Sequence, residues 1–122
     1  MVKKPVKIAF FGSDEISLPF LDAILNYCED LEIVAVLTQP DRKSGRGRIL
    51  YSNPIKKWAR DLSIPVHDPS KPGIEQVEWL KEKSVDLIFV MAYGHILDKN
   101  FLNLAPLGCF NLHASLLPKY RG

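Results

Sequence analysis

Two polar side chains near the end of the sequence, Asn111 and His113, are of types that can carry out chemistry. They alternate with Phe110 and Leu112 in a strand-like segment, so the pattern places Asn111 and His113 on one face, roughly 6 to 7 Å apart, and the apolar pair on the core face. An amide can donate hydrogen bonds to a developing oxyanion, and an imidazole can transfer a proton near neutral pH. The pair therefore suits acyl transfer to an amine. The alternative is that both side chains only satisfy backbone groups of a loop.

The residues that follow this pair carry a specific resemblance. Positions 111–122 read Asn-Leu-His-Ala-Ser-Leu-Leu-Pro-Lys-Tyr-Arg-Gly, which is similar to the active-site signature of folate-dependent formyltransferases. The resemblance implies that Asn111 stabilises the oxyanion and that His113 gives acid–base or electrostatic assistance while formyl passes from 10-formyltetrahydrofolate to an amine. It also implies that the following turn shapes the folate site, through Ser115, Leu116, Leu117 and Pro118.

A basic segment at 38–53 carries a second resemblance. Pro40, Gly45 and Gly47 predict an irregular loop there. Its runs Gln-Pro-Asp-Arg and Gly-Arg-Gly resemble the basic loop of the branch of this family that formylates initiator methionyl-tRNA. The resemblance assigns contact with the acceptor end of the tRNA to four cations, Arg42, Lys43, Arg46 and Arg48. The alternative is a solvated loop whose charges only confer solubility.

The net charge of +2 is unevenly distributed along the chain. From 39 to 60 there are seven Lys and Arg residues against Asp41 alone, a local charge of +6 that leaves −4 elsewhere. This distribution predicts a contact surface for an anionic partner. Two other functions stay open: a folate-dependent formyltransferase acting on a ribonucleotide or nucleotide sugar, which would not need this loop, and an inactive folate- or RNA-binding fragment.

A third segment, 91–97, follows an apolar run at 86–90 and resembles the formyltransferase loop whose backbone cradles the pterin ring of the folate. Backbone donors and acceptors suit the amide-like edge of a pterin, and apolar walls suit its ring. His95 is not assigned a catalytic role, and the three histidines show no metal-ligand spacing, so no metal is predicted. The resemblance implies a folate wall made by Met91, Ala92, Tyr93, Gly94, Ile96 and Leu97.

The elements that must position these segments follow from apolar periodicity. Continuous apolar runs at 7–11, 33–37 and 86–90 predict parallel strands buried on both faces. A weaker strand is expected at 64–67, near an edge because Pro65 interrupts it, and a fifth strand begins near 108. Helices are expected after a Ser17 cap, from Pro54 after a cap at Ser52 or Asn53, and over 75–83. Their expected buried faces are Leu21, Ile24, Leu25 and Cys28; Ile55, Trp58, Ala59 and Leu62; and Val77 and Leu80.

This alternation predicts an α/β fold, Rossmann-like and doubly wound, with a mainly parallel sheet and flanking helices. Gly12 stands alone after the first strand, followed by Asp14 and Glu15, so the glycine-rich fingerprint of a dinucleotide site is absent and a nicotinamide enzyme is not expected. The resemblance implies that 1–122 is the amino-terminal part of a formyltransferase catalytic domain. It places a catalytic aspartate, the rest of that domain and a carboxyl-terminal β-barrel domain after residue 122.

Composition sets the remaining expectations. The 122 residues, with 47% hydrophobic content and 25% charge, suit a single globular domain at most. Cys28 and Cys109 lack disulfide-scaffold or CxxC spacing, which predicts reduced thiols and a cytoplasmic protein. The apolar stretch before Gly12 is too short for a signal peptide, and no run approaches the ~18 residues of a membrane span. The full-length protein is expected to be a monomer.

Overall fold

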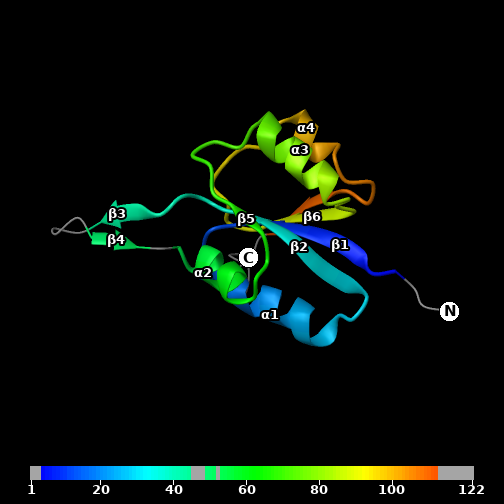
Figure 1. Ribbon diagram of the computed structural model, residues 1–122, viewed down its shortest axis with the longest axis horizontal. Helices are drawn as coiled ribbons and strands as arrows, with labels where there is room; N and C mark the ends of the chain where they lie inside the picture. The colour runs from blue at the N-terminus through cyan, green and yellow to red at the C-terminus, as the bar shows by residue number, and fades with distance from the viewer. Residues whose placement is uncertain (1–3, 45–48, 52, 113–122) are drawn as a thin grey trace, which may run out of the picture.

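The centre of the molecule is a five-stranded parallel sheet with strand order β5-β2-β1-β6-β7. The computed structural model describes residues 4–44, 49–51 and 53–112. The sheet strands are β1 (Val6–Phe11), β2 (Leu31–Leu37), β5 (Val66–His67), β6 (Leu87–Val90) and β7 (Cys109–Asn111) (Figure 1). The predicted α/β class and parallel sheet are confirmed.

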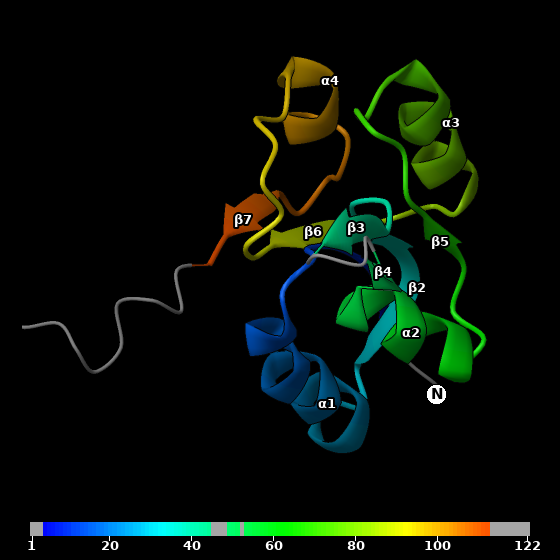
Figure 2. The same ribbon diagram turned by 90° about the vertical axis from the view of Figure 1, so that its left-hand side faces the viewer.

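Two layers of helices cover the sheet, one on each face. Helices α1 (Leu18–Tyr27) and α2 (Pro54–Asp61) lie on one face, and α3 (Ile74–Glu82) and α4 (Lys99–Leu102) lie on the other (Figures 1 and 2). Neighbouring residues of β1 point to opposite layers, because side chains alternate along a strand. Phe10 packs with the α1 and α2 side, whereas Phe11 packs with α3 and α4, and both side chains are fully buried.

The starts of the first two helices show one confirmed cap and one wrong prediction. Asn53 caps α2 as predicted, because its side-chain oxygen accepts the backbone N–H of Lys56 at 2.8 Å. Ser17 does not cap α1. Instead Asp14 caps a short 3-10 turn over Glu15–Ser17, accepting the N–H of Ile16 at 2.9 Å, and α1 continues directly from that turn. The chain has therefore already become helical before Ser17 is reached.

The apolar faces of the helices are narrower than periodicity predicts. Val77 and Leu80 of α3 are buried, as expected. Leu25 and Leu62 are exposed, because in α1 only Leu21 and Ile24 form the buried stripe, and Leu62 lies at the carboxyl end of α2. No helix within the described ranges is long and apolar enough to cross a membrane.

The basic segment contains regular structure that the sequence analysis did not predict. Strands β3 (Arg42–Ser44) and β4 (Ile49–Tyr51) form an antiparallel hairpin, in which Arg42 pairs with Tyr51 and Ser44 with Ile49. We call 42–51 the basic hairpin. The prediction of an irregular loop was wrong because Gly45 and Gly47 fall between the two strands, where they do not interrupt pairing. The paired strands project away from the parallel sheet (Figure 1).

Candidate functional site

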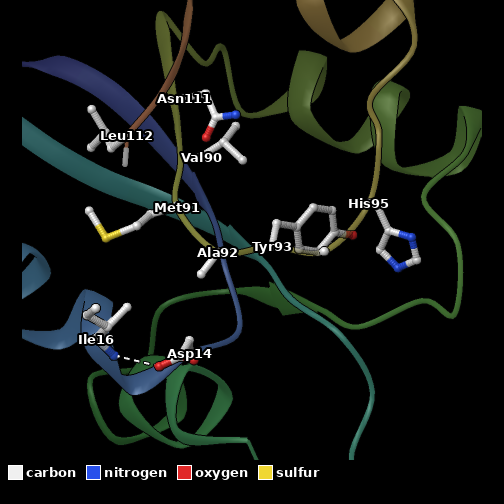
Figure 3. A pocket seen from close by; sticks show the side chains of 10 residues that line it. Asp14, Ile16, Val90, Met91, Ala92, Tyr93, His95, Asn111 and Leu112 are labelled. Atoms are coloured by element: carbon white, nitrogen blue, oxygen red, sulfur yellow. Dashed lines mark hydrogen bonds between the residues drawn. The ribbon is translucent and has the colours of Figure 1, made fainter. Parts of the chain in front are cut away.

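A cavity of about 430 Å³ opens at the carboxyl ends of β1, β6 and β7. This is the edge where open parallel sheets bind their ligands, because the chain leaves neighbouring strands there in different directions. Figure 3 shows Asn111 and Val90 on one side of the cavity, Asp14 and Ile16 on the other, and Met91 and Ala92 between them. The lining residues are Asp14, Ile16, Val90, Met91, Ala92, Tyr93, Gly94, His95, Asn111 and Leu112.

Asn111 reaches this cavity as the last residue of β7. It pairs with Val90 of β6, and the next residue, Leu112, donates its backbone N–H to the carbonyl oxygen of Val90 at 2.7 Å. Pairing with a central strand fixes the Asn111 backbone, while its side chain remains exposed to the cavity. Asn111 therefore lies at the carboxyl edge of the sheet. His113 lies outside the described residues, as do Ser115, Leu116, Leu117 and Pro118.

The face opposite Asn111 only partly agrees with the prediction of a core face. Leu112 is partly buried and packs against the cluster that includes α1 and α2. Phe110, by contrast, is 50% exposed, although its ring centroid lies 6.4 Å from that of Phe89. The prediction for Phe110 was wrong because β7 is the last strand of the described sheet, and only β6 lies beside it.

The predicted folate wall divides between two neighbouring cavities. Four of its members line the cavity with Asn111, and we call this segment, 91–94, the β6 loop. Ile96 and Leu97 instead line a second cavity of about 280 Å³, which shares Val90, His95 and Asn111 with the first. Ile96 is 98% exposed, so it extends the wall outward rather than closing it.

Backbone hydrogen bonds hold the β6 loop against β1 and β2. The N–H of Met91 donates to the carbonyl oxygen of Phe11 at 2.9 Å, and the N–H of Ser13 donates to that of Ala92 at 3.2 Å. The side-chain amide of Gln39, two residues after β2, donates to the carbonyl oxygen of Tyr93 at 2.5 Å. The loop is therefore anchored before any ligand arrives.

Two glycines permit this close packing. A Cβ on Gly12 would lie 2.5 Å from the carbonyl oxygen of Met91. Gly94 has a φ of +91°, and a Cβ there would lie 2.2 Å from the side-chain nitrogen of Gln39. Ala92 also has a positive φ, of +53°, which is unusual for a residue with a side chain. The β6 loop thus has a strained and tightly supported backbone, of the kind that functional sites often require.

The titratable groups that line the two cavities differ in their burial and therefore in their pKa values. Burial raises the pKa of Tyr93 to about 12, and its ring centroid lies 5.8 Å from that of Phe11, so it is a neutral wall residue. The Phe11 ring in turn lies 5.8 Å from that of Phe101. Burial also raises the pKa of the Cys109 thiol, which lines the second cavity and is therefore a poor nucleophile. His95 lies at the mouth, with its ring 5.0 Å from that of Tyr93.

Sequence reasoning missed some of the lining residues. Asp14 was used only as an argument against a dinucleotide site, yet its position just after β1 was a signal that it would reach the carboxyl edge of the sheet. His95 was set aside, although it borders both cavities. Across residues 4–44, 49–51 and 53–112, no group of three or more His, Cys, Asp or Glu residues could hold a metal ion.

Not every cation in the positively charged region 39–60 belongs to the contact surface that the charge count predicted. Arg42 and Lys43 belong to β3, while Arg46 and Arg48 lie outside the described residues. Lys56 is buried in α2 and paired with two carboxylates, so it does not belong to an open surface. That part of the prediction was wrong because charge counting along a sequence cannot show which cations have buried partners.

Comparison with known proteins agrees with this geometry. The protein family described as formyl transferase matches residues 6–122. The chain is 42% identical over 119 residues to a methionyl-tRNA formyltransferase of Gloeothece citriformis, covering 96% of this chain and 35% of the relative. It is 46% identical over 117 residues to the protein of the same name from Trichlorobacter lovleyi, covering 95% and 36%. The chain thus spans little more than a third of the length of these relatives.

Solved structures share the fold. A phosphoribosylglycinamide formyltransferase from Bacillus halodurans superposes with a TM-score of 0.65 at 24% identity, over 95% of this chain and 60% of that one. A glycinamide ribonucleotide transformylase from Geobacillus kaustophilus gives 0.66 at 18% identity, over 98% and 63%. At these identities the likeness concerns the fold alone. The family match over nearly the whole sequence carries the assignment, and the chain belongs to the formyl transferase family.

Proposed function

We propose that the protein carrying this chain transfers a formyl group from 10-formyltetrahydrofolate to the amino group of initiator methionyl-tRNA. The observation that supports this most directly is that Asn111 and the β6 loop line one cavity at the carboxyl edge of the sheet. The relatives named methionyl-tRNA formyltransferase, at 42–46% identity, support the choice of reaction. The protein is proposed to act in translation initiation in the cytoplasm, as a monomer.

The cavity has features that fit the folate co-substrate. The β6 loop lines the cavity, so its apolar side chains would contact the face of a flat ring, and its backbone would offer polar groups to the edge of that ring. Ile96 and Leu97 would extend this contact along the second cavity. We propose that the turn after His113 completes the folate site, with Ser115, Leu116, Leu117 and Pro118. The donor supplies an activated formyl carbon.

The chemistry requires a donor for an oxyanion and a carrier for a proton. As the amine attacks the formyl carbon, negative charge develops on the formyl oxygen, and the side-chain N–H of Asn111 would stabilise it. The bond from that carbon to the folate nitrogen then breaks. We propose that His113 transfers the proton from the attacking amine to the departing nitrogen. The orienting aspartate and the remainder of the catalytic domain would lie beyond residue 122, followed by a barrel domain.

The basic hairpin supports tRNA as the acceptor. Arg42 and Lys43 lie in a paired strand that projects from the sheet on the side of the cavity edge, where β2 ends. With Arg46 and Arg48 they would contact the phosphates of the acceptor end, giving affinity that falls with salt. Acceptors such as a ribonucleotide or nucleotide sugar would not need this projection, and the solved structures with ribonucleotide acceptors in their titles share only the fold.

The test is formyl transfer to methionyl-tRNA by the intact protein. Substituting Asn111→Ala should lower kcat by about 10²- to 10³-fold, the usual loss when one oxyanion donor is removed. Asn103→Ala, at an exposed position that ends α4, is the matched control and should leave kcat unchanged. Near-normal turnover in both Asn111→Ala and His113→Ala would refute the proposed chemistry. Binding of folate and tRNA without turnover would instead favour a non-catalytic module.

A further inference from the structure

Lys56 is a lysine held in the interior at the start of α2. Its side chain is 7% exposed, and its ammonium lies 3.1 Å from Oδ1 of Asp41 and 2.7 Å from Oδ2 of Asp68. The hydrogen bond to Asp68 raises the pKa of Lys56 and outweighs the opposing effect of burial, so the ammonium stays charged. The two carboxylates are only partly buried, because the Asp41 side chain is 23% exposed and that of Asp68 is 40% exposed. Ion pairs with such exposure contribute little to stability, whereas their directional bonds fix geometry. This suggests a role in orientation.

One of the two carboxylates lies at the start of the basic hairpin, and the other lies at the edge of the parallel sheet. Asp41 immediately precedes β3, and Asp68 immediately follows β5 of the parallel sheet. Lys56 therefore connects the first strand of the basic hairpin to the edge of the sheet through one ammonium. Because α2 begins three residues after β4, the same helix also carries the outgoing end of the hairpin.

A second set of bonds closes the base of the hairpin. The backbone N–H of Asn53 donates to Oδ1 of Asp41 at 3.3 Å, and its side-chain amide donates to the carbonyl oxygen of Gln39 at 2.5 Å. Gln39 in turn donates to the carbonyl oxygen of Tyr93 in the β6 loop. The base of the hairpin thus contacts the wall of the cavity through an unbroken chain of hydrogen bonds.

We propose that Lys56 is a positioning residue for the acceptor: through Asp41 and Asp68 it holds the basic hairpin in a fixed orientation beside the cavity, so that tRNA bound there presents its amine to Asn111. This inference rests on the proposed function. It differs from a phosphate contact, because a buried and paired ammonium is not available to the RNA. It also differs from a general contribution to stability, because the proposed role affects the binding of the tRNA acceptor and not that of the formyl donor.

The test compares Lys56→Met with Lys57→Met in the intact protein. Lys57 is the next residue of the same helix, 69% exposed and paired only with Asp61 one turn away among its described ion-pair partners, so it controls for loss of a positive charge. Lys56→Met should raise the KM for methionyl-tRNA about tenfold, because misplacing a reactant weakens productive binding. The KM for the formyl donor should stay within about twofold, because only the acceptor is misplaced. Equal tRNA KM values in the two variants would overturn the proposal.

A double-mutant cycle separates positioning from an independent effect. If Lys56 acts through the hairpin, Arg42→Ala combined with Lys56→Met should raise the tRNA KM by less than the product of the two single effects. A fully multiplicative result contradicts the proposal. Asp41→Asn, which keeps the side-chain shape and an acceptor for the Asn53 N–H, serves if Lys56→Met does not fold, and it should show the same selective rise in tRNA KM. An unchanged tRNA KM in Asp41→Asn also contradicts it.

Hydrogen exchange tests, without any substrate, whether Lys56 holds the basic hairpin in place. Backbone amides at 42–44 and 49–51 should exchange faster in Lys56→Met than in Lys57→Met, while those of β1 should be unchanged. Equal exchange in the hairpin contradicts the inference. Failure of the proposed function is recognised separately, because the unsubstituted protein would then not formylate methionyl-tRNA. Faster hairpin exchange in Lys56→Met would in that case show that Lys56 orients the basic hairpin for another acceptor.

Discussion

The side-chain amide of Gln39 donates a hydrogen bond of 2.5 Å to the carbonyl oxygen of Tyr93, across 54 positions of sequence. One residue leads from β2 into the basic hairpin, and the other lies in the loop that lines the cavity beside Asn111. The backbone of Gln39 also donates to the hydroxyl oxygen of Ser13 at 3.0 Å, which holds it near the end of β1. The proposed acceptor and donor regions therefore meet at one side chain.

Removing that amide should loosen the β6 loop. Gln39→Ala is expected to raise the KM for the formyl donor about five- to tenfold, because one hydrogen bond contributes roughly 1 kcal/mol and the Tyr93 carbonyl loses its donor. Gln39→Glu should be worse, since it places a carboxylate against that carbonyl oxygen. Steady-state kinetics with varied donor measures both. An unchanged donor KM in the two variants would show that this bond does not shape the folate site.

A side chain at Gly94 should be poorly tolerated. Gly94→Ala forces a Cβ onto a φ of +91° and within 2.2 Å of the Gln39 amide, so we expect a loss of about 1–3 kcal/mol in unfolding free energy. Gly73→Ala is the matched control, because no atom lies within 4 Å of the Cβ it would carry and its φ is −148°. Thermal or denaturant unfolding compares them, and equal losses would contradict the role assigned to Gly94.

Tyr93 should make stability sensitive to alkaline pH. Its folded pKa of about 12 exceeds the ordinary value of 10, so below pH 10 both states are protonated and its contribution is complete. Between pH 10 and 12 the unfolded state loses its proton first, and the unfolding free energy should fall by up to about 1.4 kcal/mol per pH unit. Denaturant unfolding over this range should show a steeper fall in the wild type than in Tyr93→Phe, which keeps the contributions of Lys56 and Cys109, whose pKa values are also raised.

The same variant tests the packing role of the Tyr93 ring. Its hydroxyl has no hydrogen-bond partner among the residues described, so at neutral pH Tyr93→Phe should change stability by no more than about 1 kcal/mol. Tyr27→Phe, at a residue that is 83% exposed, controls for loss of a phenol and should leave the alkaline fall intact. A large loss at neutral pH would mean that the hydroxyl bonds to a group outside the described ranges.

The cations of β3 should set the salt dependence of tRNA binding. Arg42→Ala and Lys43→Ala are each expected to weaken binding and to reduce the slope of log affinity against log salt by about one unit. The reason is that each wild-type cation would displace one counterion from a phosphate when the tRNA binds. Lys57→Ala removes an exposed, paired cation from α2 and should leave the slope unchanged. Equilibrium binding at several salt concentrations measures the slopes. Identical slopes in all three variants would show that the basic hairpin does not contact the tRNA.

Local patterns in the sequence were sufficient for the framework of the fold. The apolar runs around Ile8, Ile33 and Ile88 predicted buried parallel strands, and Asn53 before Pro54 predicted the start of α2, because strand burial and helix capping depend on residues close in sequence. The resemblance to folate-dependent formyltransferases assigned both Asn111 and the segment 91–97 to one site, and Asn111 lines a cavity together with 91–94.

Tertiary structure alone decided which polar side chains meet. The pairing of Lys56 with Asp41 and Asp68 and the bond from Gln39 to Tyr93 each join segments that no periodicity relates. Sequence patterns report which face of an element is apolar, since hydrophobic burial needs no particular partner. A buried charge or amide is stable only where a specific partner is brought within hydrogen-bonding distance, and only the folded chain determines that distance.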